Sequence, residues 1–280
     1  MADADVVPDG TETDRPSVAR LYDFFLGGHH NFAADRELGR KLLAAEPNAR
    51  YIVAENRAFL GRAVRFLLAA GVRQFLDLGS GIPTQSNVHE IAQRGDPEAR
   101  VVYVDNDPVA VGHSRQILRG NEHAAAIRED LRQPEAIAAN RDVRRLIDFS
   151  EPVGLLMITV LHFVLDADDP AGIVARYASM LAPGSYLAVS HATYEAAPDA
   201  AAEIEQMYAR TSAAAQTRSH EQILRFFDGF EIVEPGLVYL PLWRPDGAAP
   251  EHPERAWFYA GLGRKPRAGR APMPQAADVA

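Results

Sequence analysis

The stretch Phe75-Leu-Asp-Leu-Gly-Ser-Gly81 decides the fold, because it runs from an apolar segment directly into a turn with two glycines. A short apolar run followed by turn residues is typical of a buried β-strand. Glycine tolerates the backbone angles of a tight turn, and its missing side chain lets a ligand approach the main chain. We therefore predict a ligand site formed by Asp77, Gly79, Ser80 and Gly81.

Acidic residues follow the next two predicted strands. Val101-Val-Tyr-Val104 leads into Asp105 and Asn106, and the third predicted strand leads into Asp130 and Leu131. An acid at the tip of the second strand is placed to accept hydrogen bonds from two ribose hydroxyls. Asp130 is a candidate acceptor for an adenine amine, with Leu131 as a backbone donor. The alternative is a set of ordinary turns with solvated carboxylates.

The residues after the glycine turn separate two classes of ligand. A dinucleotide site favours a third glycine, where the helix packs closely on the strand and receives the pyrophosphate. Here Thr84 stands at that position, and the chain has no Tyr-x-x-x-Lys motif, so an NAD(P)-dependent oxidoreductase is disfavoured. An adenosyl-sulfonium ligand carries no phosphate, and Asp77 and Asp105 suit its cationic end and its ribose.

Strands and helices alternate along the chain. Short apolar runs predict strands at 74–78, 100–104, 124–127, 153–160, 186–190, 230–233 and 256–261. Helical periodicity predicts helices at 57–70, 88–93, 108–118, 170–180 and about 200–216. This alternation indicates an α/β fold with a doubly wound, mostly parallel sheet. No convincing helix separates the last two strands, so we expect an antiparallel pairing at the end of the chain.

Several motifs resemble those of a known family. The run from Asp77 to Gly81, the acid Asp105 and the Asp130-Leu131 pair are similar to the first three motifs of class I S-adenosylmethionine-dependent methyltransferases. More narrowly, the chain resembles an actinobacterial family of S-adenosyl methyltransferases that was once a domain of unknown function. The stretches that carry this likeness are Arg20-Leu-Tyr-Asp-Phe-Phe-Leu-Gly-Gly28, Asn31-Phe-Ala-Ala-Asp35, Val101-Val-Tyr-Val-Asp-Asn-Asp107, Val160-Leu-His-Phe-Val164 and Ser190-His-Ala-Thr193. The resemblance implies a seven-stranded Rossmann-like sheet with a reversed last strand, and S-adenosylmethionine as cofactor.

The segment before the first strand is expected to be a helical cap. Its helical pattern breaks at two glycines among aromatic and polar residues, which suits a lid. Arg20 is a candidate partner for the methionine carboxylate, and Tyr22 is a candidate for contact with the methyl group or the acceptor. Gly28 and Asn31 are expected to contact the pocket.

The end of the fourth predicted strand supplies further candidates. Ligands in open α/β sheets lie beyond the carboxyl ends of the strands, so Thr159 and Leu161 are expected to form part of the pocket wall. His162, and His191 after the fifth strand, are candidate general bases, since histidine titrates near neutral pH. The alternative for both is a structural role.

Composition limits the remaining possibilities. The 280 residues contain no cysteine and carry a formal net charge of −9, so neither a nucleic-acid nor a membrane partner is expected, and the protein is expected to be cytoplasmic. We expect an acidic, disordered leader at 1–15, one cofactor-binding domain at 16–262 with its cap at 16–56, and a flexible tail at 263–280. The pair His29-His30 lacks the clustered carboxylates of a metal site, so no metal is expected.

The sequence thus favours methyl transfer from S-adenosylmethionine to an oxygen or nitrogen of a small molecule. The rival hypothesis is a non-catalytic protein that binds S-adenosylmethionine as a sensor or regulatory module, because no general base stands out. The identity of the acceptor and the oligomeric state stay open at this level.

Overall fold

The computed structural model describes residues 12–83, 86–193, 195 and 197–267. Within them, seven strands form a sheet in the order β3-β2-β1-β4-β5-β8-β6, and the two-residue β7 pairs with β8 off this path. The strands are β1 (Gln74–Leu78), β2 (Arg100–Asp105), β3 (Ala124–Arg128), β4 (Gly154–Ile158), β5 (Tyr186–Ala192), β6 (Glu231–Ile232), β7 (Val238–Tyr239) and β8 (Phe258–Arg264). Strands β1 to β5 are parallel, and β8 runs antiparallel to β5. The predicted fold class is confirmed, including the reversed last strand.

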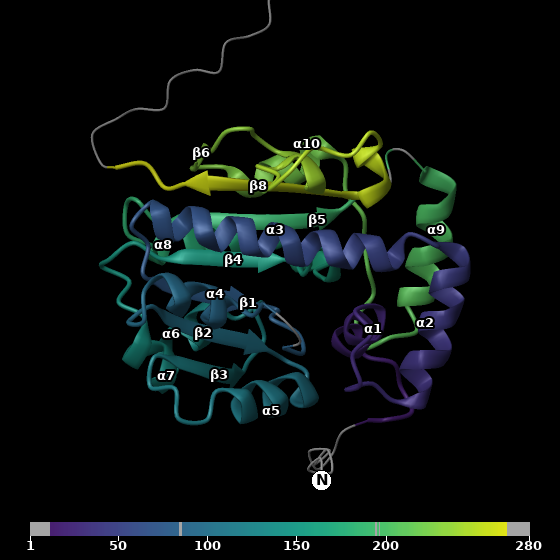
Figure 1. The fold of residues 1–280 in the computed structure, drawn as a ribbon, viewed down its shortest axis with the longest axis horizontal. Coiled ribbons are helices and arrows are strands. Elements are labelled where there is room, and N and C mark those ends of the chain that lie inside the picture. The colour runs from purple at the N-terminus through teal and green to yellow at the C-terminus, as the bar shows by residue number, and fades with distance from the viewer. Residues whose placement is uncertain (1–11, 84–85, 194, 196, 268–280) are drawn as a thin grey trace, which may run out of the picture.

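Helices cover both faces of the sheet (Figure 1). One face carries α3 (Ala49–Ala69), α4 (Val88–Gly95) and α5 (Pro108–Ile117). The other face carries α6 (Pro134–Ala139), α7 (Arg141–Leu146), α8 (Pro170–Met180) and α10 (His220–Leu224). Short 3-10 helices are η1 (Leu161–Phe163), η2 (Asp166–Asp168), η3 (Arg225–Phe227), η4 (Leu240–Leu242) and η5 (Pro253–Ala256).

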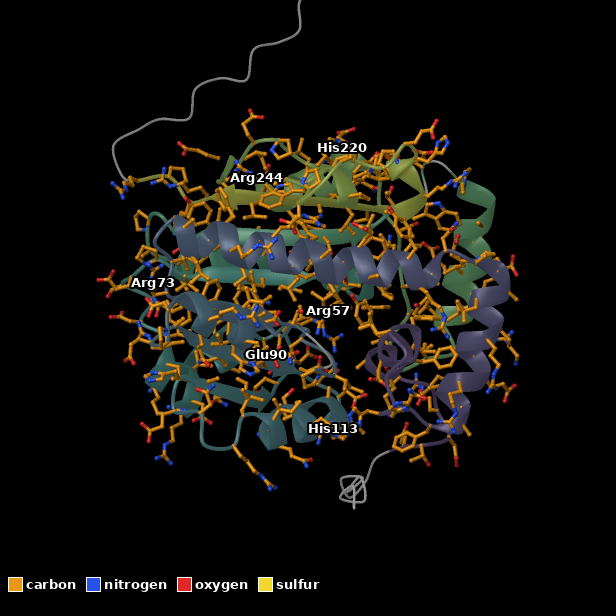
Figure 2. All side chains as sticks on the ribbon, in the orientation of Figure 1. Arg57, Arg73, Glu90, His113, His220 and Arg244 are labelled. Atoms are coloured by element: carbon orange, nitrogen blue, oxygen red, sulfur yellow. The ribbon has the colours of Figure 1, made fainter. Side chains whose placement is uncertain are left out.

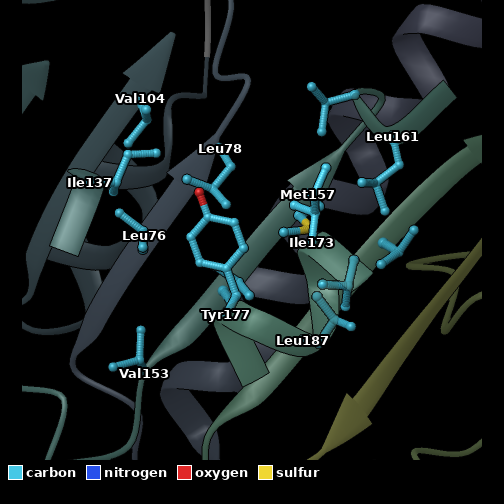
Figure 3. Close-up of a cluster of buried hydrophobic side chains, with 14 of the residues drawn as sticks. Leu76, Leu78, Val104, Ile137, Val153, Met157, Leu161, Ile173, Tyr177 and Leu187 are labelled. Carbon is cyan, nitrogen blue, oxygen red and sulfur yellow. The ribbon is translucent and has the colours of Figure 1, made fainter. Parts of the chain in front are cut away.

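Because both faces are covered, the central parallel strands are buried almost throughout. Figure 3 shows one of the two packing layers, in which Ile173 and Tyr177 of α8 lie over Leu76, Met157 and Leu187 from three neighbouring strands. These layers hold β1, β4 and β5 in fixed positions, so the loops at their carboxyl ends are built on a rigid support.

The cap consists of α1 (Val18–Phe25) and α2 (Ala33–Ala45), and α9 (Pro198–Tyr208) packs against α2. A separate apolar cluster joins these helices to α3 through Leu21, Phe25, Leu38, Leu42, Val53 and Ile204. Figure 1 places the three helices beyond the carboxyl ends of the parallel strands. Ligands of open α/β sheets bind at that edge where the strand order reverses, which here is between β1 and β4. The cap therefore lies over the expected ligand position.

Some predicted boundaries are wrong. The helix expected at 57–70 is α3, which begins two turns earlier at Ala49, and the helix expected to reach residue 216 ends at Tyr208. The strand expected at 153–160 ends at Ile158, because Thr159 adopts a left-handed backbone with φ 58°. These three differences matter for the site, since each changes which residues face it.

The ends of the domain also differ from expectation where the structure describes them. Strand β8 continues through Arg264, and the N–H of Lys265 donates to the carbonyl oxygen of Ser185 at 2.7 Å, so the chain is still paired beyond residue 263. Arg15, expected in the leader, donates to the carbonyl oxygen of Thr211 at 2.6 Å. The rest of the predicted leader at 1–11 and tail at 268–280 lies outside the described residues. Over the described ranges, no helix combines the length and apolar character needed to cross a membrane.

Candidate active site

The loop after β1 is shaped by two glycines with left-handed backbone angles, Gly79 at φ 70° and Gly81 at φ 65°. The N–H groups of Gly79 and Ser80 donate to the carbonyl oxygen of Val104 on β2, at 2.8 and 3.2 Å. A Cβ atom on Gly79 would lie 2.2 Å from Cγ2 of Val160, so glycine is needed there for space as well as for its backbone angle. A Cβ atom on Gly81 would meet no protein atom within 4 Å.

Asp105 at the end of β2 connects the two loops. Its Oδ2 accepts a hydrogen bond from the N–H of Gly81 at 2.7 Å, and its Oδ1 accepts one from the N–H of Asp107 at 2.8 Å. Each carboxylate oxygen has two lone pairs, so Asp105 retains the capacity to accept from hydroxyl groups. Burial raises the pKa of Asp105 to about 6 and that of Asp77 to about 7, although the charge of Arg57 counteracts the shift of Asp77.

A cavity of about 370 Å³ extends from these loops to the cap. Its polar end lies at the tips of β1, β2 and β3 and is lined by Asp77, Gly79, Ser80, Gly81, Asp105, Asn106, Glu129, Asp130 and Leu131. Its apolar end lies under the cap and α9 and is lined by Phe25, Leu42, Ile52, Val53, Phe163, Ile204, Tyr208 and Phe258. One cavity thus joins carboxylates and backbone amides to an apolar chamber.

Most of the predicted site residues line this cavity, and five of them lie outside its lining. Those that line it are Tyr22, Asp77, Gly79, Ser80, Gly81, Asp105, Asn106, Asp130, Leu131, Thr159 and His162. Those that do not are Arg20, Gly28, Asn31, Leu161 and His191. The residues of the second group make contacts that explain why they are absent from the lining.

Arg20 is buried in an ion-pair network rather than directed at the cavity. Its Nε donates to Oδ2 of Asp35 at 2.8 Å, and its NH1 lies 3.8 Å from Oδ2 of Asp107. The hydroxyl of Ser17 donates to the same oxygen of Asp107. Because Asp107 lies in the loop that follows β2, this network fastens the cap to that loop. The expected contact of Arg20 with a ligand carboxylate is not supported, since its charge is already paired.

Gly28 and Asn31 belong to the turn between α1 and α2. The Nδ2 of Asn31 donates to Oδ2 of Asp23 at 2.8 Å and to the carbonyl oxygen of Gly28 at 2.9 Å. A Cβ atom on Gly28 would lie 1.9 Å from Oδ1 of Asp23, so this position requires glycine for packing. The sequence pattern at these residues is thus explained by the shape of the cap and not by contact with this cavity.

His191 is fully buried, and both of its ring nitrogens have partners. Nδ1 donates to the carbonyl oxygen of Ala192 at 2.8 Å, which leaves Nε2 to accept from NH1 of Arg218 at 2.9 Å. Burial lowers the pKa of His191 to about 3. Arg218 also donates to the carbonyl oxygen of Leu161, whose side chain is in the core. The geometry therefore does not support His191 as a base or Leu161 as a pocket wall.

His162 and Tyr22 do line the cavity, and burial shifts the pKa of each in the direction that favours its neutral form. Nδ1 of His162 is buried without a hydrogen-bond partner among the described residues, and burial lowers the pKa of this ring well below its ordinary value. His162 is therefore neutral at physiological pH. The hydroxyl of Tyr22 donates to the carbonyl oxygen of Val53 at 3.2 Å, and burial raises its pKa to about 12, so Tyr22 keeps its proton.

Asp130 lines the polar end but is already engaged. Arg132 donates to it from Nε at 2.9 Å and from NH2 at 2.6 Å, both to Oδ2. Burial acts to raise the pKa of Asp130, but these hydrogen bonds outweigh it and lower the pKa. The neighbouring Leu131 is fixed through its carbonyl oxygen, which accepts from the hydroxyl of Tyr177 at 2.8 Å. Across the described residues, no cluster of three or more His, Cys, Asp or Glu side chains could hold a metal ion.

Two cavity residues on α3, Asn56 and Arg57, escaped the sequence analysis. Oδ1 of Asn56 accepts from Oγ1 of Thr159 at 2.8 Å and from Oγ of Ser190 at 2.6 Å, which holds the left-handed Thr159 in place. Arg57 lowers the pKa of Asp77 against the effect of burial. Figure 2 shows Arg57 on the side of α3 that faces α1 and the strand ends.

A signal for Asn56 was present in the sequence. This residue continues the apolar stripe of α3 at the spacing of Phe59, Leu60 and Val64, and a polar residue on such a stripe indicates a buried hydrogen-bonding role. The helix predicted from sequence begins only at Arg57, so Asn56 falls outside its stripe.

The fold, the glycine loop and the acids at the strand tips define a class I S-adenosylmethionine-dependent methyltransferase. The sequence model of a family described as S-adenosyl methyltransferase matches residues 5–266, so the chain belongs to this family. S-adenosylmethionine is its cofactor.

Solved structures agree with this assignment. A candidate methyltransferase from Thermobifida fusca is 40% identical, with a TM-score of 0.88, covering 94% of this chain and 100% of its own. A DUF574 family protein from Streptomyces avermitilis is also 40% identical, with a TM-score of 0.87 and coverage of 91% and 99%. Magnesium protoporphyrin IX methyltransferase from Synechocystis, at 16% identity and a TM-score of 0.53 over 88% of this chain and 93% of its own, shares the fold. No curated protein matches the sequence.

Proposed function

We propose that this methyltransferase acts on an oxygen or nitrogen atom of a small molecule bound at the apolar end of the cavity. The observation that carries this proposal is the joining of the polar end to the apolar end in one cavity beneath the cap. Helices α1, α2 and α9 cover that chamber, so an acceptor must fit beneath them. A small apolar molecule meets this requirement better than a segment of a macromolecule.

The polar end suits the cofactor. We assign the ribose hydroxyls to Asp105, the adenine to the loop of Asp130 and Leu131, and the amino group to Asp77. The space beside Gly81, which a Cβ atom would enter without touching protein, supports close approach of the cofactor to the backbone. When bound, S-adenosylmethionine supplies an electrophilic methyl group on a sulfonium centre.

The chain contributes mainly alignment to the reaction. Displacement at a sulfonium has a neutral leaving group, so holding the acceptor atom in line accounts for much of the rate enhancement. A base is needed only for an acceptor that must lose a proton. His162 is the candidate for that role, because it is neutral and its Nδ1 has no partner among the described residues. Tyr22 is assigned to positioning, since it keeps its own proton.

Turnover with a labelled cofactor tests the proposed function. We expect the wild-type protein to bind S-adenosylmethionine but not NAD in calorimetry, and to transfer labelled methyl groups to small molecules of a metabolite extract. Cofactor binding without transfer to any small molecule would favour the sensor hypothesis. Transfer only to macromolecules would contradict the small-molecule acceptor.

Arg57, in place of Arg20, is our candidate for binding the methionine carboxylate. Arg57→Ala is expected to weaken cofactor affinity by roughly tenfold or more, because a charge-assisted hydrogen bond is lost. Arg20→Ala is expected to destabilise the fold by about 3–5 kcal/mol, since it leaves Asp35 buried without its cation. Calorimetry and thermal melts measure the two effects, and an affinity loss in Arg20→Ala without one in Arg57→Ala would reverse the assignment.

Cofactor affinity is expected to depend on pH. The pKa values of Asp77, about 7, and of Asp105, about 6, are raised, so lowering the pH protonates Asp77 first. The neutral form of Asp77 no longer attracts a cationic amino group, so affinity should fall between about pH 8 and about pH 5. Binding near pH 7 should release protons, which calorimetry detects in buffers of different ionisation enthalpy. A constant affinity over this range would exclude Asp77 from cofactor recognition.

A further inference from the structure

Glu46 is a buried carboxylate at the apolar end of the cavity, and the assigned cofactor contacts do not use it. It follows the last residue of α2, lines the cavity, and is only 5% exposed. Its Oε1 accepts a hydrogen bond from the N–H of Asn48 at 2.6 Å. Burial raises the pKa of Glu46, which reflects the cost of holding a charge among apolar side chains. Such a carboxylate is favoured when a ligand supplies a cation or a donor.

The charges around the cavity make a cationic ligand more favourable than an anionic one. Its acidic lining residues are Glu46, Asp77, Asp105, Asp107, Glu129, Asp130 and Asp168. Among the described lining residues the only Arg or Lys side chains are Arg57 and Arg132. Arg57 acts on Asp77 and Tyr22, and Arg132 pairs with Asp130 and Asp168, whereas the charge of neither arginine is among the causes that shift the pKa of Glu46. An acceptor with a carboxylate at the apolar end would meet Glu46 without a compensating cation.

Helix α3 shows that Glu46 lies far from the polar end. The N–H of Ala49 donates to the carbonyl oxygen of Glu46 at 3.1 Å, so the start of α3 marks the position of Glu46. Arg57 is eight residues further along the same helix, which at 1.5 Å per residue corresponds to about 12 Å. The side chain of Glu46 is therefore available to the acceptor while the polar end holds the cofactor.

One further feature favours a positive charge near Glu46. The carboxyl end of α2 and the amino end of α3 meet at this residue, so their opposite partial charges offset each other and do not decide the matter. The aromatic side chains of Phe25 and Tyr208 also line this end of the cavity, and aromatic faces attract ammonium groups.

We propose that the methyl acceptor carries a protonated amino group on an apolar or aromatic frame, and that Glu46 binds this group. The inference rests on the proposed function, because it assigns the chemistry of the acceptor held in the same cavity. Glu46 is a specificity-determining residue here: it selects the acceptor and takes no part in bond making.

Binding of three matched phenols to the full chain tests the proposal, with S-adenosylhomocysteine present to fill the cofactor site. Tyramine carries an ammonium group, 4-ethylphenol is neutral, and 3-(4-hydroxyphenyl)propanoate carries a carboxylate. We expect the wild-type protein to bind tyramine roughly tenfold or more tightly than 4-ethylphenol, and the propanoate most weakly. Hexylamine and hexanol provide the same comparison on an aliphatic frame.

The variant Glu46→Gln removes the charge but keeps an oxygen that can accept from the N–H of Asn48. It is expected to weaken tyramine binding roughly tenfold or more and to leave 4-ethylphenol and S-adenosylhomocysteine binding unchanged. The matched control is Glu37→Gln, on the exposed side of α2, where Glu37 pairs with Lys41 at the surface. This control should leave all the affinities unchanged.

The outcomes separate the two proposals. Equal wild-type affinity for the amine and its neutral partner, or no amine binding on either frame, would overturn the inference without requiring any variant to fold. Unchanged tyramine affinity in Glu46→Gln would also overturn it. Labelled products from a metabolite extract should be retained on a cation-exchange resin, and anionic products would contradict the inference. Failure of the wild-type protein to bind S-adenosylhomocysteine or to methylate any small molecule would instead count against the proposed function.

Discussion

Replacing Asp105 with alanine is expected to lower the affinity for S-adenosylmethionine roughly 100-fold, because two hydrogen bonds from ribose to a carboxylate are lost. The same carboxylate accepts from the N–H groups of Gly81 and Asp107, so the variant also loosens both loops that surround the cofactor. Calorimetry on wild type and variant measures the affinity, and a thermal melt of each reports the loosening separately.

Asp142→Ala serves as the control for this change. Asp142 lies on α7 with a side chain that is 47% exposed and pairs with Arg145 at the surface. Its replacement should leave cofactor affinity unchanged and stability within about 0.5 kcal/mol of wild type. If Asp105→Ala binds the cofactor as tightly as this control, the ribose assignment is wrong.

Gly79→Ala is expected to produce the largest loss of stability in the cofactor loop. The new Cβ atom would lie 2.2 Å from Cγ2 and 2.7 Å from Cβ of Val160. Either the loop after β1 or the segment after β4 that contains Val160 must therefore move. The left-handed backbone adds about 1–2 kcal/mol for a residue with a side chain, and overpacking adds about 1–3 kcal/mol. The sum lowers the free energy of unfolding by about 2–5 kcal/mol, and a displaced loop loses the cofactor.

Gly81→Ala is the matched control, because Gly81 has nearly the same backbone angle but open space around its Cβ position. We expect only the backbone cost of about 1–2 kcal/mol in the cofactor-free protein. Denaturant unfolding without cofactor compares the two variants directly. Equal losses in the two variants would show that Val160 yields easily and that contact with it does not explain the need for glycine at position 79.

The glycine loop and the acids that line the polar end could be proposed from sequence, because these residues follow directly from local pattern. Asp77, Gly79 and Gly81 end one apolar run, and Asp105 ends the next. Parallel strands bring their carboxyl ends to one edge, so alternation of strands and helices was enough to place these residues together. The structure adds that Asp130 is paired with Arg132, its neighbour two residues along the chain.

The contacts of the cap and the acceptor half of the site could not be predicted in the same way. From sequence, Arg20 is a candidate for binding a carboxylate because it is charged, and His191 is a candidate base because it is titratable and follows a strand near the site. Their actual partners, Asp35 and Arg218, are 15 and 27 residues away along the chain. Asp35 pairs with the guanidinium of Arg20, and Arg218 donates to Nε2 of His191, so neither group is available to a ligand. Glu46 gave no signal at all, since a single acid at the end of a helix is usually exposed.

By itself, the sequence determined the class of fold and the family, and it proposed the loop from Asp77 to Gly81 as part of the cofactor site. The backbone angles of glycine, the periodicity of a strand and an acid at a strand tip depend on residues that are adjacent in the chain, so they can be recognised in the sequence. The tertiary structure decided which side chains line the cavity and how they are paired. Burial and pairing between distant residues placed Arg57 in the cavity lining and Arg20 outside it, left Nδ1 of His162 without a partner among the described residues, and placed Glu46 at the apolar end of the cavity.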